Sequence, residues 1–395
     1  MKRLLNKDVL CFAGADWNNP LWTNRQHIMS RLASGNRIIY VESIALRSAN
    51  LTSGADVGRI IRKLKQLVSP LRKVQDTLWV LTPFIIPFNA RLFRLLNDFL
   101  LFLQISVAMK YVGFSKPILW AYLPQALGLI RRFSFSAIIY HCVDEYSAIP
   151  GVSGDYFKKI EDEFIRQSNV VFVTSMGLLE SKGKQKKETY YLPNVADYEL
   201  FSKARSPETT IPAILSNNSK SVIGYIGNLC DHKVDIELLI AVADTFRESN
   251  LVIVGPIWGG DNKTDLLIND LKSYTNVSMC GAQSRELLPG FLKSFSVCLV
   301  PYKFNNYTKN CFPLKIHEYL ASGKPVVASA LSAIRDYSEV MYFSATKEEF
   351  LGNIRIAMFE NDNPKRDKRI QLASHNTWEN RILSMEKILS ELKLI

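Results

Sequence analysis

The sequence lacks the signatures of several common ligand-binding classes. It contains neither G-x-x-x-x-G-K-[ST] nor G-x-G-x-x-G, which excludes a P-loop site and disfavours a dehydrogenase. No C-x-x-C pair occurs among its six scattered cysteines, which are Cys11, Cys142, Cys230, Cys280, Cys298 and Cys311. This spacing disfavours a zinc knot and a disulfide framework, and it favours a reducing compartment.

Long apolar runs are also missing. The longest, residues 99–109, includes Gln104 and is shorter than the roughly 20 residues that a membrane-spanning helix needs. The first residues, MKRLLNKDVLCFAGADW, begin with basic side chains, but their apolar stretch ends before Asp16. They therefore predict a first β-strand rather than a signal peptide, and we expect a cytoplasmic protein without a transmembrane helix.

The composition is that of a globular protein with an excess of positive charge. Of 395 residues, 47% are hydrophobic and 22% are charged, and the length suits two domains. Lys and Arg number 49 against 37 Asp and Glu, which gives a net charge of +12. This excess favours an anionic partner such as a phosphorylated small molecule or an anionic membrane face, although many basic proteins bind neither.

Short apolar runs alternate with amphipathic stretches, which is typical of parallel sheets covered by helices. The runs that predict strands are 9–13, 37–41, 78–81, 118–121, 137–141, 170–174, 189–192, 221–226, 251–254, 277–280, 297–300 and 325–328. Residues 204–220 are rich in Ser, Pro, Thr and Asn and predict a linker. We expect an α/β protein with Rossmann-like domains at 1–203 and 221–372 that face each other across a cleft, and a helix at 373–395 that crosses back to the first domain.

The most informative segment is NCFPLKIHEYLASGKPVVAS, residues 310–329. Pro313 suits the first turn of a helix, and Gly323 suits its end before the next strand. A helix N-terminus that faces a cleft offers free N–H groups and a positive dipole end, which can bind a diphosphate. Glu318, one turn further, could accept hydrogen bonds from ribose hydroxyls, or it could be a solvated side chain on a capped surface helix.

This segment resembles the C-terminal signature of GT-B glycosyltransferases of the family 4 type. It is especially similar to the bacterial cell-surface polysaccharide branch that includes the teichuronic acid glycosyltransferases. Members carry a Pro-Leu-Lys-x-x-Glu-Tyr-Leu-Ala-x-Gly-Lys-Pro-Val-Val block, which is matched here from Pro313 to Val327. The resemblance implies that Glu318 contacts the ribose of a nucleotide-sugar and that N–H groups around Phe312, Pro313 and Leu314 meet its diphosphate.

Two further blocks extend the resemblance, and the chain departs from the family pattern at two positions. GYIGNLCDHKVD, residues 224–235, resembles a family loop whose arginine and lysine grip the donor phosphates; Gly227 and Lys233 match, whereas Asn228 stands in the place of the arginine. Gly255, in the VGP segment, resembles a loop around the base. The family usually has a second glutamate eight positions before Glu318, where this chain has Asn310, and this leaves the sugar and the stereochemistry of transfer open.

The N-terminal half resembles the family more loosely. Residues 12–33 take the place of its first strand, loop and helix, where Gly14 permits a tight turn and Asp16 and Asn24 could bind hydroxyls of the acceptor. His27 could also face the acceptor, or it could be structural. At the end of a predicted strand, Asp144 or Glu145 could activate or orient the acceptor hydroxyl, and both could equally be loop charges with a capping role.

Two stretches of the N-terminal half suggest a membrane contact. Residues 57–75 hold six cations, which are Arg59, Arg62, Lys63, Lys65, Arg72 and Lys73, and residues 91–105 are apolar with a basic edge. This pattern fits a helix that rests on the anionic inner face of the plasma membrane. It fits equally a helix packed within the N-terminal domain beside a solvated basic face.

The resemblance as a whole implies a glycosyltransferase of the hexosyltransferase type in cell-surface polysaccharide biosynthesis. The donor would be a nucleoside diphosphate sugar, such as a UDP-sugar, and the acceptor a saccharide that is lipid-linked; no cofactor, metal ion or nucleic acid is expected. The absence of Asp-x-Asp disfavours the metal-dependent GT-A type. Lys233 would stabilise the departing diphosphate. Two alternatives stay open: a nucleotide-sugar epimerase of similar fold, and a catalytically silent partner subunit, which the two asparagines favour.

Overall fold

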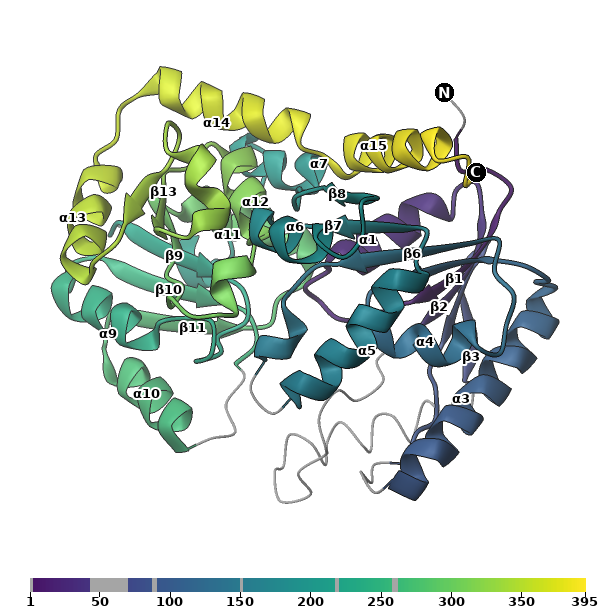
Figure 1. The fold of residues 1–395 in the computed structure, drawn as a ribbon. Helices are drawn as coiled ribbons and strands as arrows, with labels where there is room; N and C mark the ends of the chain where they lie inside the picture. The colour runs from purple at the N-terminus through teal and green to yellow at the C-terminus, as the bar shows by residue number, and fades with distance from the viewer. Residues whose placement is uncertain (1–2, 43–69, 87–90, 150–151, 217–219, 258–261) are drawn as a thin grey trace. The chain divides into compact units, whose positions relative to one another are not determined.

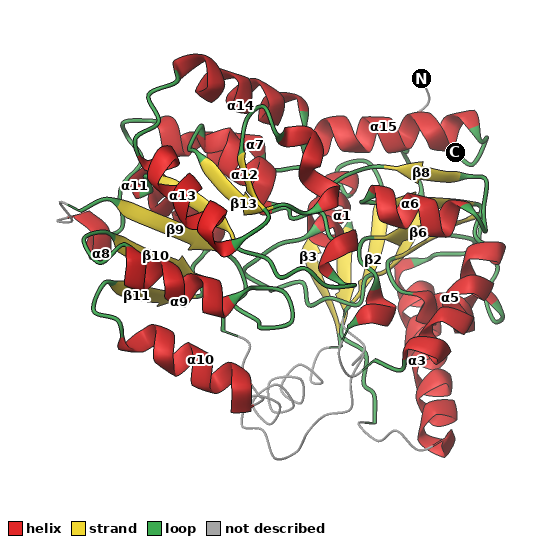
Figure 2. Ribbon diagram, turned by 60° about the vertical axis from the view of Figure 1, so that its left-hand side comes forward, coloured by secondary structure: helices red, strands yellow, loops and turns green. Residues whose placement is uncertain are grey.

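The computed structural model describes residues 3–42, 70–86, 91–149, 152–216, 220–257 and 262–395. The chain forms two compact units, the first made of Met1–Leu192 with Ile382–Ile395 and the second of Pro193–Arg381 (Figure 1). Both are α/β, as predicted, and in each the strands lie between helices (Figure 2). The segment 204–220, which the sequence analysis treats as the linker, lies inside the second unit.

The sheet of the first unit has eight strands in the order β3-β4-β2-β1-β5-β6-β7-β8. Their bounds are β1 (Asp8–Phe12), β2 (Arg37–Val41), β3 (Leu71–Gln75), β4 (Leu78–Leu81), β5 (Ile118–Ala121), β6 (Ala137–Cys142), β7 (Val170–Val173) and β8 (Thr189–Tyr191). Every pair is parallel except β3 with β4, which is antiparallel. The central strands are buried along their length because helices cover both faces.

Strand β3 lies within the basic stretch 57–75, which the sequence fitted equally to a membrane contact or to a solvated basic face. Its residues pair with β4 at the edge of the sheet. Arg72 and Lys73 therefore lie on a strand. The other four cations of that stretch, Arg59, Arg62, Lys63 and Lys65, lie outside the described residues.

The helices of the first unit are α1 (Asn24–Leu32), α3 (Arg91–Val112), η1 (Pro124–Ala126), α4 (Leu127–Ile130), η2 (Tyr146–Ala148), α5 (Gly154–Gln167) and α6 (Met176–Gly183). Helix α1 begins with a capping box in which Thr23 and Gln26 satisfy free N–H groups of the first turn. Within the described ranges, no helix combines the length and apolar character that crossing a bilayer requires.

The second unit has six parallel strands in the order β11-β10-β9-β12-β13-β14. They are β9 (Val222–Ile226), β10 (Asn250–Val254), β11 (Val277–Gly281), β12 (Val297–Val300), β13 (Val326–Ser329) and β14 (Tyr342–Ser344). The helices are α7 (Tyr198–Ser202), η3 (Lys203–Arg205), α8 (Ala213–Ser216), α9 (Ile236–Thr245), α10 (Asn262–Ser273), η4 (Arg285–Leu287), α11 (Leu288–Ser294), η5 (Thr308–Asn310), α12 (Lys315–Ser322), η6 (Ser332–Tyr337), α13 (Lys347–Met358) and α14 (Asn363–His375).

The last helix, α15 (Trp378–Glu391), returns the chain to the first unit, as predicted. Residues up to Arg381 belong to the second unit, and those from Ile382 belong to the first. Within the first unit, the buried Glu386 carboxylate accepts a hydrogen bond of 2.9 Å from the N–H of Leu4. The last helix is thereby held to the segment that precedes β1.

Candidate functional site

The strand order locates a candidate site in the second unit. From β9 the chain moves to β10 on one side, whereas β12, β13 and β14 lie on the other, so the order reverses between β9 and β12. Open parallel sheets bind ligands at the carboxyl ends of the strands that flank such a reversal. The loops that follow these two strands, residues 227–235 and 301–314, contain most of the predicted donor-binding residues.

Gly227 and Gly255 end β9 and β10 in backbone conformations that favour glycine, with φ of 147° and 143°. A Cβ atom on Gly255 would lie 2.1 Å from the carbonyl oxygen of Gly227. The two strand ends thus pack backbone against backbone, and a larger residue at Gly255 would force them apart.

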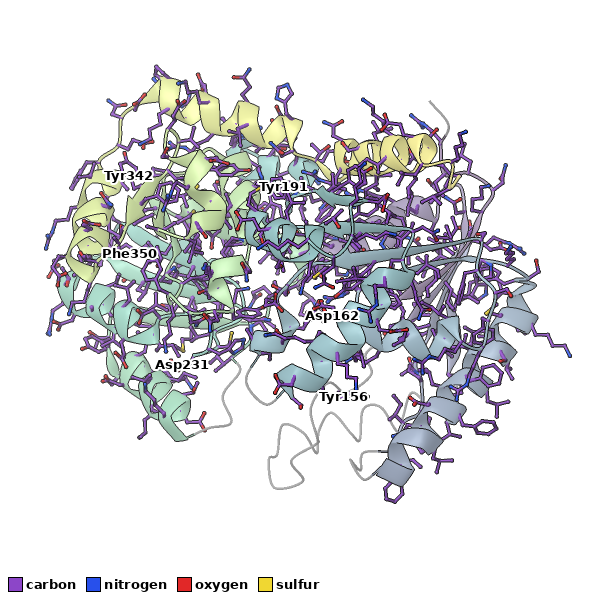
Figure 3. All side chains as sticks on the ribbon, viewed as in Figure 1. Tyr156, Asp162, Tyr191, Asp231, Tyr342 and Phe350 are labelled. Atoms are coloured by element: carbon purple, nitrogen blue, oxygen red, sulfur yellow. The ribbon has the colours of Figure 1, made fainter. Side chains whose placement is uncertain are left out.

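The loop after β9 is fixed to the loop after β12. The Tyr225 hydroxyl donates to the carbonyl of Asn228 at 2.9 Å, and the N–H of Lys303 donates to the carbonyl of Lys233 at 3.0 Å. Asp231, labelled in Figure 3, pairs with the Lys303 ammonium group. These contacts hold the Lys233 side chain at the carboxyl end of the sheet, with its Nζ 4.9 Å from the centroid of the Tyr302 ring.

Helix α12 ends where the sequence predicts, but it begins at Lys315, so Pro313 precedes its first turn. The carbonyl of Phe312 accepts a hydrogen bond from Asn194 before the helix begins, and Gly323, with φ of 76°, ends it. The Tyr319 hydroxyl accepts from the N–H of Ile226 at 2.8 Å, which locks the helix against the end of β9. Among the described residues, no acceptor is found for the N–H groups of Phe312 and Leu314. Both remain available to a ligand anion.

Glu318 lies half-buried on the first turn of α12. Within the described part of the chain, no hydrogen bond or ion pair joins its carboxylate. Burial raises its pKa to about 7, against the lowering effect of Lys315 and Arg285. An unsatisfied carboxylate with a perturbed pKa is typical of a functional site, and the contact with ribose stays a prediction.

Lys315 also lies at this site, although it was not among the predicted site residues. Its side chain is buried, and Nζ lies 3.7 Å from the centroid of the Tyr225 ring. Burial, together with nearby Lys233, lowers its pKa well below the usual value. Its place in the Pro-Leu-Lys block was the one signal that could have identified it.

The two asparagines that depart from the family pattern lie near the same loops. Asn228 follows Gly227 directly, and its side-chain oxygen is buried without a hydrogen-bond partner among the described residues. Asn310 ends η5 half-buried, and its N–H donates to the carbonyl of Tyr307 at 3.2 Å. Neither side chain supplies a charge to the site.

In the first unit the strand order reverses between β1 and β5, where four predicted acceptor residues lie. Gly14 has φ of 65°, and a Cβ atom there would lie 2.1 Å from a methyl group of Leu123. Asp16 is exposed, whereas Asn24 and His27 are buried on α1. The His27 ring packs edge-on against Trp22, and its Nδ1 lies 3.2 Å from a nitrogen of Arg31.

The adjacent carboxylates Asp144 and Glu145, which follow β6, have different interaction partners. Glu145 accepts from the Ser147 hydroxyl at 2.6 Å and pairs at 3.4 Å with Lys182, a buried cation that also pairs with Glu161 at 2.6 Å. Its carboxylate is therefore tied into a buried network.

Asp144 instead interacts electrostatically with Arg25. Arg25, which was not predicted, donates to the Tyr146 hydroxyl and lies over the Tyr122 ring at 5.3 Å. Because Arg25 lies in the first turn of α1, Tyr122 follows β5 and Asp144 follows β6, these groups meet at the carboxyl edge of the sheet.

Residues 220–353, which contain the whole site of the second unit, match the family model described as Glycosyl transferases group 1. The chain is 27% identical over 226 residues to TuaH of Bacillus subtilis (strain 168), a protein assigned as a teichuronic acid biosynthesis glycosyltransferase. That alignment covers 54% of the chain and 55% of TuaH, so it spans about half the length of this relative. The resemblance inferred from the sequence is confirmed.

Solved structures match the fold along nearly the full chain. Sucrose-phosphate synthase from Thermosynechococcus elongatus superposes with a TM-score of 0.68 at 16% identity, covering 98% of this chain and 99% of that one. Anabaena HepE in complex with UDP-glucose gives 0.64 at 16% identity, covering 98% and 100%. An E. coli trehalose-6-phosphate structure bound with UDP-2-fluoro glucose gives 0.69 at 11% identity, covering 98% and 99%. The predicted two-domain GT-B fold is confirmed.

Proposed function

We propose that the chain, whose residues 220–353 form a group 1 glycosyl transferase domain, transfers a sugar from a nucleoside diphosphate sugar to a saccharide acceptor. The observation that carries this proposal is the grouping of Glu318, Lys233 and the free N–H groups that precede α12 at one strand reversal. A carboxylate suits the ribose hydroxyls of such a donor, and a cation with helix-end N–H groups suits its diphosphate.

A UDP-sugar is the donor that we favour. The structures of HepE and of the E. coli protein, which share this fold, hold UDP-glucose and UDP-2-fluoro glucose. A transferred hexose would leave UDP behind, and the charge that develops on its diphosphate would be stabilised by Lys233 and the N–H groups of Phe312 and Leu314. We propose that this charge stabilisation needs no metal ion.

Asp144 is the better of the two candidate carboxylates for the acceptor. Glu145 already has two partners, of which Lys182 is buried, so moving it would disrupt that network. Asp144 lies at the carboxyl edge of the sheet beside Arg25. There it could take the proton of the acceptor hydroxyl or orient that hydroxyl.

The proposal is tested with the purified full-length chain. UDP and UDP-hexoses should raise its unfolding midpoint, because a ligand that binds the folded state stabilises it. Incubation with a UDP-hexose and a saccharide acceptor, in EDTA, should release UDP and lengthen the saccharide, as followed by NMR. Conversion of the donor to its epimer without release of UDP would instead identify an epimerase. Donor binding without any turnover would identify a silent subunit.

We further propose that the acceptor is lipid-linked and that α3 rests on an anionic membrane surface. Five apolar side chains at helical spacing are exposed on α3: Leu96, Phe99, Leu103, Val107 and Tyr111. Figure 1 shows this helix at the periphery of the first unit. An exposed apolar stripe of this kind marks an interaction surface, and the net charge of +12 complements an anionic leaflet rather than a second copy of the chain.

Flotation with anionic liposomes at low salt tests this surface. The wild-type chain should float, and the double variant Phe99→Ser/Val107→Ser should bind vesicles at least about tenfold more weakly, because two side chains lose their apolar burial. Leu266→Ser, which alters an exposed leucine on α10, is the matched control and should float normally. A wild-type chain that stays at the bottom contradicts the proposal, as does a dimer that the double variant converts to monomer.

A further inference from the structure

One buried cation of the second unit, Lys315, forms no ion pair within the part of the chain that the structure describes. Lys315, the first residue of α12, is only 7% exposed, and its Nζ lies 3.7 Å from the centroid of the Tyr225 ring and 5.2 Å from that of Tyr302. Within the described ranges, it makes no ion pair with a carboxylate. Aromatic faces offset part of the cost of burying an ammonium group, but an isolated buried charge remains unfavourable.

The ammonium group of Lys315 lies at the carboxyl end of β9. A Cβ atom on Gly227 would lie 2.4 Å from Lys315 Nζ, so the ammonium group sits directly against the end of β9. Lys233 reaches the same place from the following loop, and its Nζ lies 4.9 Å from the centroid of the Tyr302 ring that Lys315 also contacts. Two lysines therefore converge where the strand order reverses, beside the free N–H group of Leu314.

We infer that Lys315 and Lys233 form one binding site for the diphosphate of the donor, in which Lys315 supplies the positive charge that Asn228 does not. This inference rests on the proposed function and deepens it. Two cations held side by side repel each other, and a ligand with at least two negative charges offsets this repulsion because it attracts both. A diphosphate also offers enough oxygen atoms for both ammonium groups and for the helix-end N–H groups.

The charged groups around Lys315 determine how the affinity for UDP depends on pH. Burial lowers its pKa first and Lys233 lowers it further, while Glu318, Cys230 and Cys311 act in the opposite direction. An arriving diphosphate adds negative charge and raises the pKa again. Binding of UDP should therefore be accompanied by uptake of a proton, and its affinity should decline at high pH.

The test compares UDP with uridine by titration calorimetry on the full-length chain. Lys315→Met should weaken UDP binding about ten- to a hundredfold, because a charge-assisted contact to phosphate is lost, and should leave uridine binding within about twofold. Lys233→Met should behave alike. The matched control is Lys324→Met, which alters a half-buried lysine whose pKa burial also lowers but whose Nζ donates to the carbonyl of Lys293. It should bind both ligands normally.

Proton uptake supplies a readout that a purely structural role would not change. At pH 8, the heat of UDP binding should vary with the ionisation enthalpy of the buffer for the wild type and for Glu318→Gln, but not for Lys315→Met.

The inference fails if Lys315→Met binds UDP as tightly as the wild type, or if it loses UDP and uridine equally. A wild-type chain that binds neither ligand would instead overturn the proposed function.

Discussion

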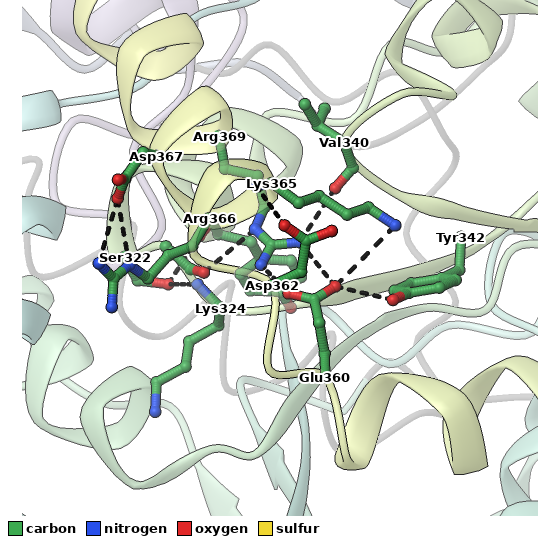
Figure 4. A network of polar contacts seen from close by, with 12 residues as sticks. Ser322, Lys324, Val340, Tyr342, Glu360, Asp362, Lys365, Arg366, Asp367 and Arg369 are labelled. Atoms are coloured by element: carbon green, nitrogen blue, oxygen red, sulfur yellow. Dashed lines mark hydrogen bonds and ion pairs between the residues drawn. The ribbon is translucent and has the colours of Figure 1, made fainter.

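Replacing Arg369 with methionine should lower the unfolding midpoint of the second unit by about 10 °C. The Arg369 side chain is 1% exposed and pairs with Glu360, which is 5% exposed. It also donates to the carbonyls of Gly323 and Val340, at 3.1 and 3.2 Å, and so ties α14 to the end of α12 and to the segment before β14 (Figure 4). Its loss leaves two carbonyls without their partner, and the Glu360 carboxylate keeps only the Tyr342 hydroxyl at 2.8 Å and the Lys365 ammonium group at 3.9 Å. We expect this to cost about 3 kcal/mol.

Scanning calorimetry measures this effect, because it can resolve the transitions of two units. Arg247→Met is the control: Arg247 and its partner Asp244 are both largely exposed, and the change should leave the unfolding midpoint of the second unit unchanged. The double variant Arg369→Met/Glu360→Met should be more stable than Arg369→Met, since it also removes the buried carboxylate that has lost its main counter-charge. A double variant that is no better than the single one would show that packing, not charge, accounts for the loss.

The strands that the sequence predicts well are those buried in the middle of a parallel sheet. Strand β12 occupies the predicted residues, and β9 and β10 differ from their predicted bounds by one residue at the N-terminal end. The agreement is close because a short, continuous apolar run between helices is typical of a buried parallel strand. Strand β3 was missed because its side chains alternate between half-buried and exposed and two are basic. Only its pairing with β4, a tertiary contact, makes it a strand.

The candidate site likewise contains features that the sequence predicted and features that it did not. Helix α12 and its end at Gly323 were predicted, because Gly323 acts through local backbone geometry, although the helix begins at Lys315 and leaves Pro313 before its first turn. The burial of Lys315 was not predicted, because the two tyrosine rings against it come from the ends of β9 and β12. Burial and partners of this kind depend on packing between distant segments, which the order of residues does not display.

The same limit applies to Asp144 and Glu145. As neighbours they were equivalent in the sequence, and they differ in the structure only through Arg25 and Lys182, which lie on other elements.

Replacing Glu318 with glutamine should lower the affinity for UDP at least about hundredfold at pH 8, with a similar loss in kcat/KM for a UDP-sugar. The ionised carboxylate can accept hydrogen bonds from both ribose hydroxyls, and each bond to a charged group contributes about 1.5–3 kcal/mol. Calorimetry with UDP and uridine measures the loss, which should be equal for the two ligands because both contain the ribose. Glu286→Gln, at an exposed glutamate in the same unit, is the control and should bind normally.

The raised pKa of Glu318 makes this prediction depend on pH. Since its pKa is about 7, the carboxylate is largely protonated at pH 6 and ionised at pH 8, and uridine affinity should rise across that interval in the wild type. Glu318→Gln should show a flat profile. A wild-type profile without a rise, or a glutamine variant that keeps the rise, would assign the titration to another group.

The same shift predicts that Glu318 weakens the free protein. A carboxyl group whose pKa is raised from 4.5 to about 7 binds protons more tightly in the folded chain than in the unfolded one, so folding stability falls as the pH rises across that range. Glu318→Gln should therefore raise the unfolding midpoint of the second unit at pH 8 while it removes donor binding. A residue kept for structure would do the reverse, so a variant that loses stability together with binding would contradict a ligand-binding role for this carboxylate. A half-buried carboxylate that lowers folding stability is expected where the group is retained because it binds a ligand.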